Sequence, residues 1–259
     1  MALVDWHRAG AAFDGLASRY DELWTRSTVG RLQRDAVWKR LDPLFRPGDS
    51  LLDLGCGTGE DSLHFVGLGI NVRAIDASCE MVRVARSRGV NATVLGIEYL
   101  DCITGQFDGV ISDFGALNCV SDLNPVRQTL GSLVLPGGFF AACVLGRFCL
   151  WEAVWYLLRG NPRKAFRRWR AGRLATSLQI RVHHFSVRQL ERAFYPEFSL
   201  VEWRGIGISV PPSYITCAPD WLLRACGRID RRVAHWPLVR ALADHRLLIF
   251  VRNRAGLVQ

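Results

Sequence analysis

Short hydrophobic runs alternate with amphipathic stretches through the first half of the chain. The runs are rich in β-branched residues and predict strands at 50–54, 71–75, 92–95, 107–112 and 139–145. The stretches between them predict helices that begin near Glu60 and Cys79, and one that covers 124–133. A regular alternation of strands and helices is typical of an α/β fold in which the sheet is parallel and doubly wound.

This alternation is lost after Leu145. Residues 147–190 are basic and rich in tryptophan, which we interpret as helices, and two further strands are predicted at 198–203 and 246–252. The seven strands together predict one mostly parallel, Rossmann-like sheet. We therefore expect a single domain over 1–259, divided as follows: an N-terminal helical segment (1–48), a strand–helix core (49–146), a helical insertion (147–197) and C-terminal strands and helices that complete the sheet (198–259).

Composition excludes a disordered or fibrous chain, because 49% of the 259 residues are hydrophobic and 22% are charged. The net charge of +9 is concentrated in one place. Seven basic residues and no acid lie in 159–173, which leaves a net charge of two for the remainder. Such a local concentration argues against a nucleic-acid wrapper and favours one anionic partner or an anionic surface.

The eight cysteines form no C-x-x-C pair and have no histidine at ligand spacing, so neither a zinc site nor an iron–sulfur site is indicated. Several lie in apolar runs such as 141–144, where a thiol behaves as a small hydrophobic group. Reduced thiols and an N-terminus without a basic and then apolar leader predict a cytoplasmic protein.

Residues 133–158 carry only two charges, Arg147 and Glu152, and are long enough to cross a bilayer. However, Pro136-Gly137-Gly138 interrupts the stretch near its start. We therefore interpret it as a buried strand followed by an amphipathic helix.

The most informative segment is 51–61, where a predicted strand leads into three alternate glycines and then a helix. Glycines at this position let a ligand approach the backbone, and the helix N-terminus offers free N–H groups to an anion. Asp76 ends the next strand, where a carboxylate can accept both hydroxyls of a ribose. A nicotinamide dinucleotide would fit equally, except that Glu60 stands where that fingerprint needs its third glycine, and an acid, Asp53, precedes the loop.

The segment 51–61 resembles the first motif of the class I S-adenosylmethionine-dependent methyltransferases, D/E-x-G-x-G-x-G. The likeness extends over about residues 10–146. Residues 13–21 look like the N-terminal segment of the quinone-biosynthesis group, 107–112 like the fourth strand, and 135–138 like the turn into the fifth. The resemblance implies a small-molecule methyltransferase, with 49–146 as its cofactor-binding core and 147–197 as a lid over the substrate.

The resemblance also implies roles for single residues. Gly55, Gly57 and Gly59 would surround the methionine part of the cofactor, Asp53 would help to hold its amino group, and Asp76 would bind its ribose. Where the family often has Asp after the third strand, this chain has Gly96-Ile97-Glu98, so the adenine contact falls to Glu98 or the backbone of Ile97. The complete set of expected cofactor residues is Tyr20, Asp53, Gly55, Cys56, Gly57, Gly59, Asp76, Ala77, Ile97, Glu98, Asp113 and Phe114.

Each assignment has a plainer structural alternative. The glycines could form only a tight turn, Asp76 could cap the helix after it, Glu98 could be a solvated loop acid, and Tyr20 could be a packed aromatic ring.

Substrate residues are expected at the carboxyl ends of the fourth and fifth strands, because open α/β sheets bind ligands there. These candidates are Asp113, Phe114, Asn118 and Arg147. Methyl transfer needs a base only when the nucleophile carries a proton, and the candidates for this catalytic role are His183, His184 and Asp113. The histidine pair lies in a strand-like stretch, 179–185, and also fits a purely structural role.

Aromatic residues are interleaved with the basic residues of the insertion, and we assign Trp151, Trp155 and, from a rigid Pro-Pro loop, Tyr214 to the substrate side. Such a segment could close over an apolar substrate with an anionic group, contact a membrane surface through 159–173, bind RNA by stacking, or form a solvated basic face. Tyr214 could equally belong to a plain turn.

We conclude from the sequence that the chain transfers a methyl group from S-adenosylmethionine, leaving S-adenosylhomocysteine, to a small-molecule or lipid-like acceptor by in-line displacement. The alternatives are an RNA methyltransferase, an NAD(P)-dependent oxidoreductase and a non-catalytic binding module. The chain has no attached RNA-binding module and no N/D-P-P-Y/F motif, which argues against nucleic acid. No metal is implied, and the acceptor atom stays open between oxygen, nitrogen and carbon.

Overall fold

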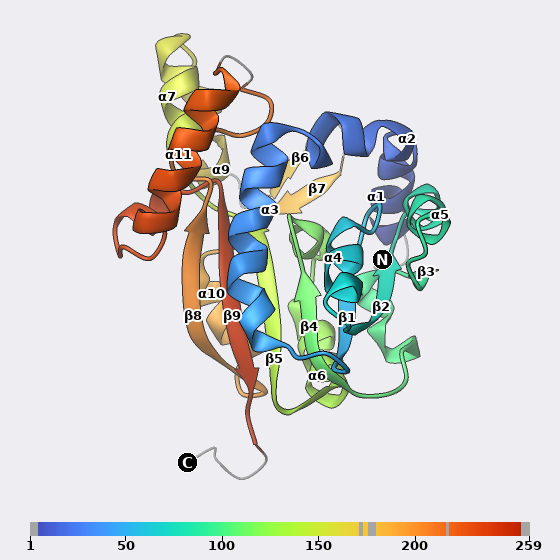
Figure 1. The fold of residues 1–259 in the computed structure, drawn as a ribbon. Helices are drawn as coiled ribbons and strands as arrows, with labels where there is room; N and C mark the ends of the chain where they lie inside the picture. Colours follow the sequence, from blue (N-terminus) through green and yellow to red (C-terminus); the bar gives the residue numbers. More distant parts are fainter. Residues whose placement is uncertain (1–4, 171–172, 176–179, 216–217, 255–259) are drawn as a thin grey trace.

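In the computed structural model, residues 5–170, 173–175, 180–215 and 218–254 are described. They form a central sheet with helices on both faces (Figure 1). The first described elements are helices, namely α1 (Asp5–Asp14), α2 (Ala17–Tyr20), η2 (Asp21–Thr25), α3 (Thr28–Leu41) and η3 (Asp42–Leu44).

Strand–helix units follow. Their elements are β1 (Ser50–Leu54), α4 (Glu60–Gly67), β2 (Asn71–Asp76), α5 (Cys79–Ser87), β3 (Ala92–Val94), η4 (Ile97–Cys102), β4 (Phe107–Ser112), η5 (Ala116–Cys119), α6 (Leu123–Leu133) and β5 (Val134–Leu145). Several helices begin at a residue whose side chain caps them. Ser78, for example, accepts a hydrogen bond from the Met81 amide at 3.1 Å, which satisfies one of the free N–H groups of α5.

The second half holds short elements and then the last two strands of the sheet. They are α7 (Leu150–Leu158), α8 (Pro162–Ala165), α9 (Arg167–Arg170), β6 (Arg173–Ala175), β7 (Arg181–His183), α10 (Val187–Phe194), β8 (Phe198–Ile206), α11 (Asp220–Val233), η6 (Val239–Leu242) and β9 (His245–Arg252).

The strand order of the main sheet is β3-β2-β1-β4-β5-β9-β8. Strands β1 to β5 are parallel, and β9 pairs antiparallel with both β5 and β8. The predicted α/β class with a mostly parallel, doubly wound seven-stranded sheet is therefore confirmed. The parallel strands all end at one edge of the sheet, where α1, α2, β6 and β7 lie in Figure 1.

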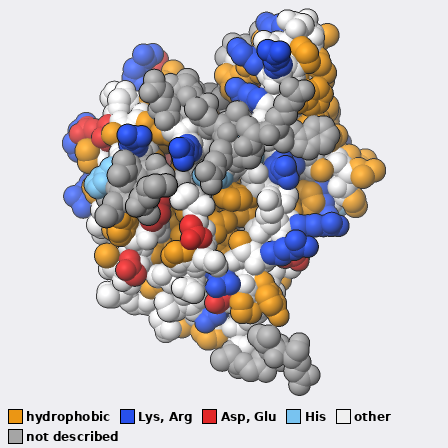
Figure 2. Space-filling view, turned by 180° about the vertical axis from the view of Figure 1, so that it is seen from behind, with side chains coloured by type: hydrophobic (Ala, Val, Ile, Leu, Met, Phe, Trp, Pro, Cys, Tyr) orange, Lys and Arg blue, Asp and Glu red, His pale blue; other side chains and the backbone are white. Residues whose placement is uncertain are grey.

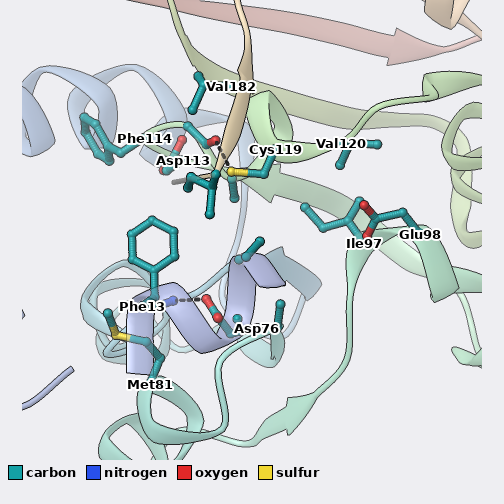
Figure 3. Close-up of a pocket in the computed structure, with 18 of the residues that line it drawn as sticks. Phe13, Asp76, Met81, Ile97, Glu98, Asp113, Phe114, Cys119, Val120 and Val182 are labelled. Carbon is teal, nitrogen blue, oxygen red and sulfur yellow. Dashed lines mark hydrogen bonds between the residues drawn. The ribbon is translucent and has the colours of Figure 1, made fainter. Parts of the chain in front are cut away.

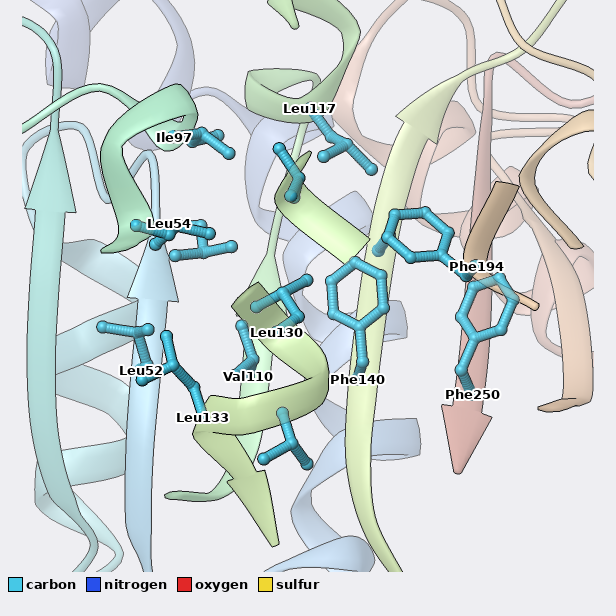
Figure 4. Close-up of a cluster of buried hydrophobic side chains, with 14 of the residues drawn as sticks. Leu52, Leu54, Ile97, Val110, Leu117, Leu130, Leu133, Phe140, Phe194 and Phe250 are labelled. Carbon is cyan, nitrogen blue, oxygen red and sulfur yellow. The ribbon is translucent and has the colours of Figure 1, made fainter. Parts of the chain in front are cut away.

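The core consists of one hydrophobic layer on each face of the sheet. On the face covered by α6 and α10, Phe140 of β5 packs against Phe194 and Phe250, with ring centres 4.8 and 5.7 Å apart (Figure 4). On the face covered by α3 and α4, Val37 and Phe65 pack with the other side of the strands. Both faces are buried, which is the rule for parallel strands and explains their continuous hydrophobic runs.

The structure differs from the sequence prediction in two places. Strand β5 begins at Val134, five residues earlier than expected, because a register shift against β4 accommodates Pro136-Gly137-Gly138. The expectation of helices through 147–190 is wrong for β6, which pairs antiparallel with β7 in a small second sheet; β7 falls in the stretch 179–185, which was expected to be strand-like. Their pairing depends on contacts between segments, which helical periodicity does not reveal.

Residues 133–158 hold the end of α6, β5 and α7. None of the helices in the described part of the chain has both the length and the apolar character needed to cross a membrane.

Candidate functional site

The loop between β1 and α4 has a conformation that depends on glycine. Gly55, Gly57 and Gly59 have φ values of +76°, +54° and +84°, in the left-handed region that other residues enter only at a cost. The amides of Gly55 and Cys56 both donate to the Ile75 carbonyl, at 2.8 and 3.0 Å. The loop is thereby tied to the end of β2.

Asp76 completes this tie with its side chain. Its Oδ2 accepts a hydrogen bond from the Gly57 amide at 2.8 Å, and its Oδ1 accepts one from the Ser78 amide at 2.8 Å. Burial raises the pKa of the Asp76 carboxyl, while these two backbone donors oppose the rise. Asp76 therefore caps the turn before α5 and at the same time holds the glycine loop.

A cavity of about 250 Å³ opens beside this loop, at the carboxyl edge of the parallel strands (Figure 3). Many of the predicted site residues meet there. The glycine loop and β2 contribute Gly55, Gly57, Asp76 and Ala77 to its wall. Other segments contribute Tyr20, Ile97, Glu98, Asp113 and Phe114. Burial raises the pKa of Tyr20 to about 12, so its hydroxyl keeps its proton.

Three residues expected at the cofactor do not line the cavity: Asp53, Cys56 and Gly59. Asp53 is buried beneath the glycine loop, where it accepts a hydrogen bond from the Ser62 hydroxyl at 2.6 Å. Burial, followed by the nearby Asp61 carboxylate, raises the pKa of Asp53 to about 7. Its expected contact with the cofactor stays a prediction.

Helix α1 forms a wall of the cavity that the sequence analysis did not assign. Ala9, Gly10 and Phe13 line it. A Cβ atom on Gly10 would lie 2.2 Å from the Ala77 carbonyl oxygen, so only glycine lets α1 approach so closely. The small-residue run 9–12 followed by Phe13 was the signal available in the sequence.

Asp14 fastens the end of α1 to α5. One of its carboxylate oxygens accepts hydrogen bonds from the Ser78 hydroxyl at 2.5 Å and the Glu80 amide at 3.1 Å. The helix that closes the cavity is therefore anchored to the same turn that Asp76 organises.

Asp113, directly after β4, is the most unusual group of the cavity wall. It is 7% exposed, and neither carboxylate oxygen has a hydrogen-bond partner among the described residues. Burial, with the Asp61 and Asp53 carboxylates second and third, raises the pKa of Asp113 well above its ordinary value, and Arg34 opposes this only in part. A buried polar group without a partner is costly and is often functional.

Arg34 and Asp61 form the polar neighbourhood of Asp113, and neither was assigned from the sequence. Arg34 pairs with Asp61, and the Trp38 indole donates to the same carboxylate at 2.8 Å. The Arg34 guanidinium also lies 5.2 Å from the centre of the Phe114 ring. Arg34 belongs to α3 and Asp61 to α4, and both are far from Asp113 in the sequence, so no local pattern predicts the cluster.

Phe114 has a left-handed backbone, with φ of +53°, which is rare for an aromatic residue. Its ring is fixed by edge contacts with Trp24 and His245, with ring centres 4.7 and 5.5 Å away. The loop after β4 is therefore held in a strained conformation at the cavity.

The histidine pair lies outside the cavity lining, although Ile180 and Val182 just before it line the wall. His183 stacks on Phe185, and His184 has no hydrogen-bond partner at Nδ1 in the part of the chain that is described. Burial, and then Arg168 and Arg167, lower the pKa of His184 to about 4, so it is neutral at pH 7. A catalytic role for either histidine stays a prediction.

The remaining candidates for the substrate side also lie off the cavity lining: Asn118, Arg147, Trp151, Trp155 and Tyr214. Asn118 is fully buried and joins two elements, since its amide donates to the His183 carbonyl at 2.6 Å and accepts from the Leu145 amide at 2.8 Å. The Trp151 indole donates to the Ser209 carbonyl at 2.9 Å. Their contact with a substrate stays a prediction.

The basic segment 159–173 is not one uniform face. Arg168 is 7% exposed and forms ion pairs with Glu152 and Asp244 inside the protein. Residues 171–172 lie outside the described residues. Among the residues that are described, no group of three or more His, Cys, Asp or Glu is arranged to hold a metal ion.

The chain matches a family model described as a methyltransferase domain over residues 51–138. This range covers the glycine loop, Asp76, Asp113 and the strands that carry them. The methyltransferase family expected from the glycine motif is therefore confirmed by an independent comparison.

Two curated relatives and one solved structure are similar to this chain. Demethylmenaquinone methyltransferase of Mycolicibacterium vanbaalenii is 31% identical over 168 residues, which are 62% of this chain and 72% of the relative. An uncharacterized protein of Methanocaldococcus jannaschii is 29% identical over 153 residues, 59% of this chain. The chain spans 57% of the length of that protein.

The crystal structure of 1,6-didemethyltoxoflavin-N1-methyltransferase of Burkholderia thailandensis, with 1,6-didemethyltoxoflavin and S-adenosylhomocysteine bound, has the same fold. The TM-score is 0.57 at 19% identity, over 95% of this chain and 88% of that one. Together with the glycine motif and the identity to the mycobacterial relative, these comparisons show that the chain belongs to the S-adenosylmethionine-dependent methyltransferases.

Proposed function

We propose that the protein transfers a methyl group from S-adenosylmethionine to a small, largely apolar acceptor by in-line displacement. The observation that carries the proposal is the composition of the cavity wall. One side consists of the glycine loop and Asp76, and the other of apolar side chains around Asp113, whose carboxyl has no hydrogen-bond partner in the described part of the chain. A cofactor and an acceptor can therefore meet in one space.

The residues at the cavity fit the cofactor. Gly57 lines the cavity. A Cβ atom added to it would meet no other described atom within 4 Å, so a ligand can come close to the backbone there. Asp76 uses its oxygens for two backbone donors and retains lone pairs that would accept the hydroxyls of a ribose. Ile97 and Glu98 would flank the adenine.

When bound, the cofactor supplies a methyl group on a sulfonium, and its positive charge disappears as the methyl group leaves. The remaining task of the protein is to align the acceptor within about 3–3.5 Å of that carbon and to exclude water. Phe13, Met81 and Val182 give the cavity an apolar wall for this purpose. Phe114, held in a strained backbone, would orient the acceptor ring or chain.

We assign Asp113 as the group that takes the proton of an acceptor hydroxyl or N–H. The pKa of its carboxyl is raised by burial, which brings it nearer to the pH range in which a base is effective. Because neither oxygen is occupied within the described residues, both are free for the acceptor. His183 and His184 remain alternative bases.

Two observations support a small acceptor. The relatives named above are called after demethylmenaquinone and 1,6-didemethyltoxoflavin. The walls around Asp113 are mainly hydrophobic, which suits a lipid-like or aromatic molecule better than a polynucleotide. An anionic group on the acceptor stays a prediction.

Calorimetry with S-adenosylhomocysteine tests the first half of the proposal. We expect micromolar affinity or better and no binding of NADH. A radiolabelled methyl donor with a panel of quinols, phenols and fatty acids tests the second half. Binding of NADH in place of S-adenosylhomocysteine would overturn the proposal, and labelling of RNA with none of the small molecules would overturn the choice of acceptor.

We also propose a cytoplasmic location. The described cysteines, Cys56, Cys79, Cys102, Cys119, Cys143, Cys149 and Cys226, are all free thiols. Free thiols are typical of a reducing compartment. Cell fractionation with an antibody against the protein tests this, and recovery from an extracellular fraction would contradict it.

A further inference from the structure

Helix α7 leaves a hydrophobic stripe uncovered on one side. The stripe follows the i, i+4, i+7, i+8 spacing of one helix face. Its members are Leu150, Val154, Leu157 and Leu158, which are 38%, 41%, 46% and 82% exposed. The helix is anchored on the opposite side by Glu152, which is 1% exposed and pairs with Arg168, and beside the stripe by the Trp151 indole, which donates to the Ser209 carbonyl. The stripe therefore faces outward on a helix that is held in place.

Cations border this stripe. Arg159 follows the last leucine, and its guanidinium lies 3.3 Å from the centre of the Trp155 ring. Arg163 and Lys164 of α8 are exposed. The acid of this stretch, Glu152, is 1% exposed and turned inward to Arg167 and Arg168. The outward charges from Leu150 to Lys164 are therefore all positive.

We call this surface the α7–α8 tip and define it by Leu150, Val154, Leu157, Leu158, Arg159, Arg163 and Lys164. Helix α7 projects from the upper end of the molecule in Figure 1. Seen from behind, hydrophobic and basic side chains gather together on that projection (Figure 2). Exposed apolar patches on a soluble chain mark interaction sites.

We propose that the α7–α8 tip docks on the surface of an anionic lipid bilayer. Aliphatic side chains flanked by Lys and Arg insert between headgroups while the cations bind lipid phosphates. The Trp155–Arg159 stack belongs to the same chemistry, since tryptophan rings favour the interface and arginine binds phosphate.

The charges and side chains of the tip argue against other occupants. A second copy docked on the same patch would bring Arg159, Arg163 and Lys164 close to identical cations, which repel. RNA would use aromatic rings that stack on bases, whereas the exposed stripe is aliphatic. The proposal rests on the surface alone and not on the methyl transfer argued above.

Sedimentation of the full chain with vesicles tests whether the α7–α8 tip docks on an anionic bilayer. Wild type should sediment with phosphatidylcholine vesicles that contain phosphatidylglycerol and much less with phosphatidylcholine alone. Leu157→Gln with Leu158→Gln should lower the vesicle affinity roughly tenfold or more by removing apolar insertion. Arg163→Gln with Lys164→Gln should lower it to a similar extent and weaken its salt dependence, because only Arg159 remains of the three cations of the tip.

Matched controls place the same changes elsewhere. Val66→Gln with Leu68→Gln changes two exposed apolar side chains at the end of α4. Arg188→Gln with Arg192→Gln removes two exposed cations from α10. Both controls should bind vesicles like wild type, and all variants should bind S-adenosylhomocysteine like wild type.

Three results would overturn the proposal. One is a wild-type protein that stays in the supernatant with anionic vesicles at low salt. Another is an equal loss of binding in the control variants. The third is a wild-type dimer in solution that Leu157→Gln with Leu158→Gln converts to a monomer, which would make the tip an interface between copies.

Discussion

The amide of Gly57 donates a 2.8 Å hydrogen bond to Oδ2 of Asp76, so the residue proposed to bind the ribose also holds the glycine loop. The two parts of the cofactor site are therefore mechanically coupled. A change at Asp76 acts both on a ligand contact and on the shape of the loop.

Replacing Asp76 should weaken cofactor binding for both reasons. We expect Asp76→Ala to lose about 2–3 kcal/mol of S-adenosylhomocysteine binding, the usual cost of removing a charged partner from hydrogen bonds. Asp76→Asn should lose less, because its amide oxygen can still accept from Gly57. Calorimetry measures the S-adenosylhomocysteine affinity of both variants. Asp101→Ala, at an exposed position, is the control. Wild-type affinity in a folded Asp76→Ala protein would mean that the carboxylate does not contact the cofactor.

Two alanine substitutions in the glycine loop should separate stability from binding. Gly55→Ala places a Cβ atom 2.2 Å from that of Ala116 at a φ of +76°, so urea unfolding should report a loss of about 2 kcal/mol or more. Gly57→Ala meets nothing within 4 Å and should lose only about 1 kcal/mol from backbone strain. Gly57→Ala should nevertheless weaken S-adenosylhomocysteine binding, because Gly57 lines the cavity and an added methyl group takes space from a ligand there. Equal stability of the two variants would contradict the close approach of the loops.

Asp113→Asn tests the proposed base. A base works in its deprotonated form, so wild-type kcat/KM should rise with pH through the raised pKa of this carboxyl. In Asp113→Asn that rise should disappear and kcat should fall by about 10²–10⁴-fold, the range typical of general-base catalysis. Because Asp113 is also among the expected cofactor residues, S-adenosylhomocysteine affinity is measured in parallel and kcat is compared at saturating cofactor. An Asn variant with a wild-type rate and pH profile would exclude Asp113 from proton transfer.

His184 should govern part of the acid sensitivity of the fold. Its pKa is lowered from 6.5 to about 4, so between these values the unfolded chain binds a proton that the folded chain does not. The free energy of unfolding should therefore fall as the pH falls from about 6.5 to about 4. His184→Gln should reduce this fall, whereas the exposed His235→Gln should not. Urea titrations across that pH range measure it, and an undiminished fall in His184→Gln would refute the assignment.

The sequence alone was sufficient for the strand–helix order from Ser50 to Leu145, the sheet class and the glycine loop. Each of these rests on local signals, namely apolar periodicity, helix caps such as Ser78, and glycines that must adopt positive φ at Gly55 and Gly57. The family followed from the same local motif. Local rules act within a few residues, and such signals are therefore readable without a structure.

Only the tertiary structure decided which residues share the cavity and which charges face outward. Asp113 is buried without a hydrogen-bond partner among the described residues, and Phe13 lines the wall because Gly10 lets α1 approach Ala77. Arg168 looks like a surface cation in the sequence but is buried with Glu152. Burial and pairing are set by contacts between distant segments, so neither periodicity nor composition could assign them.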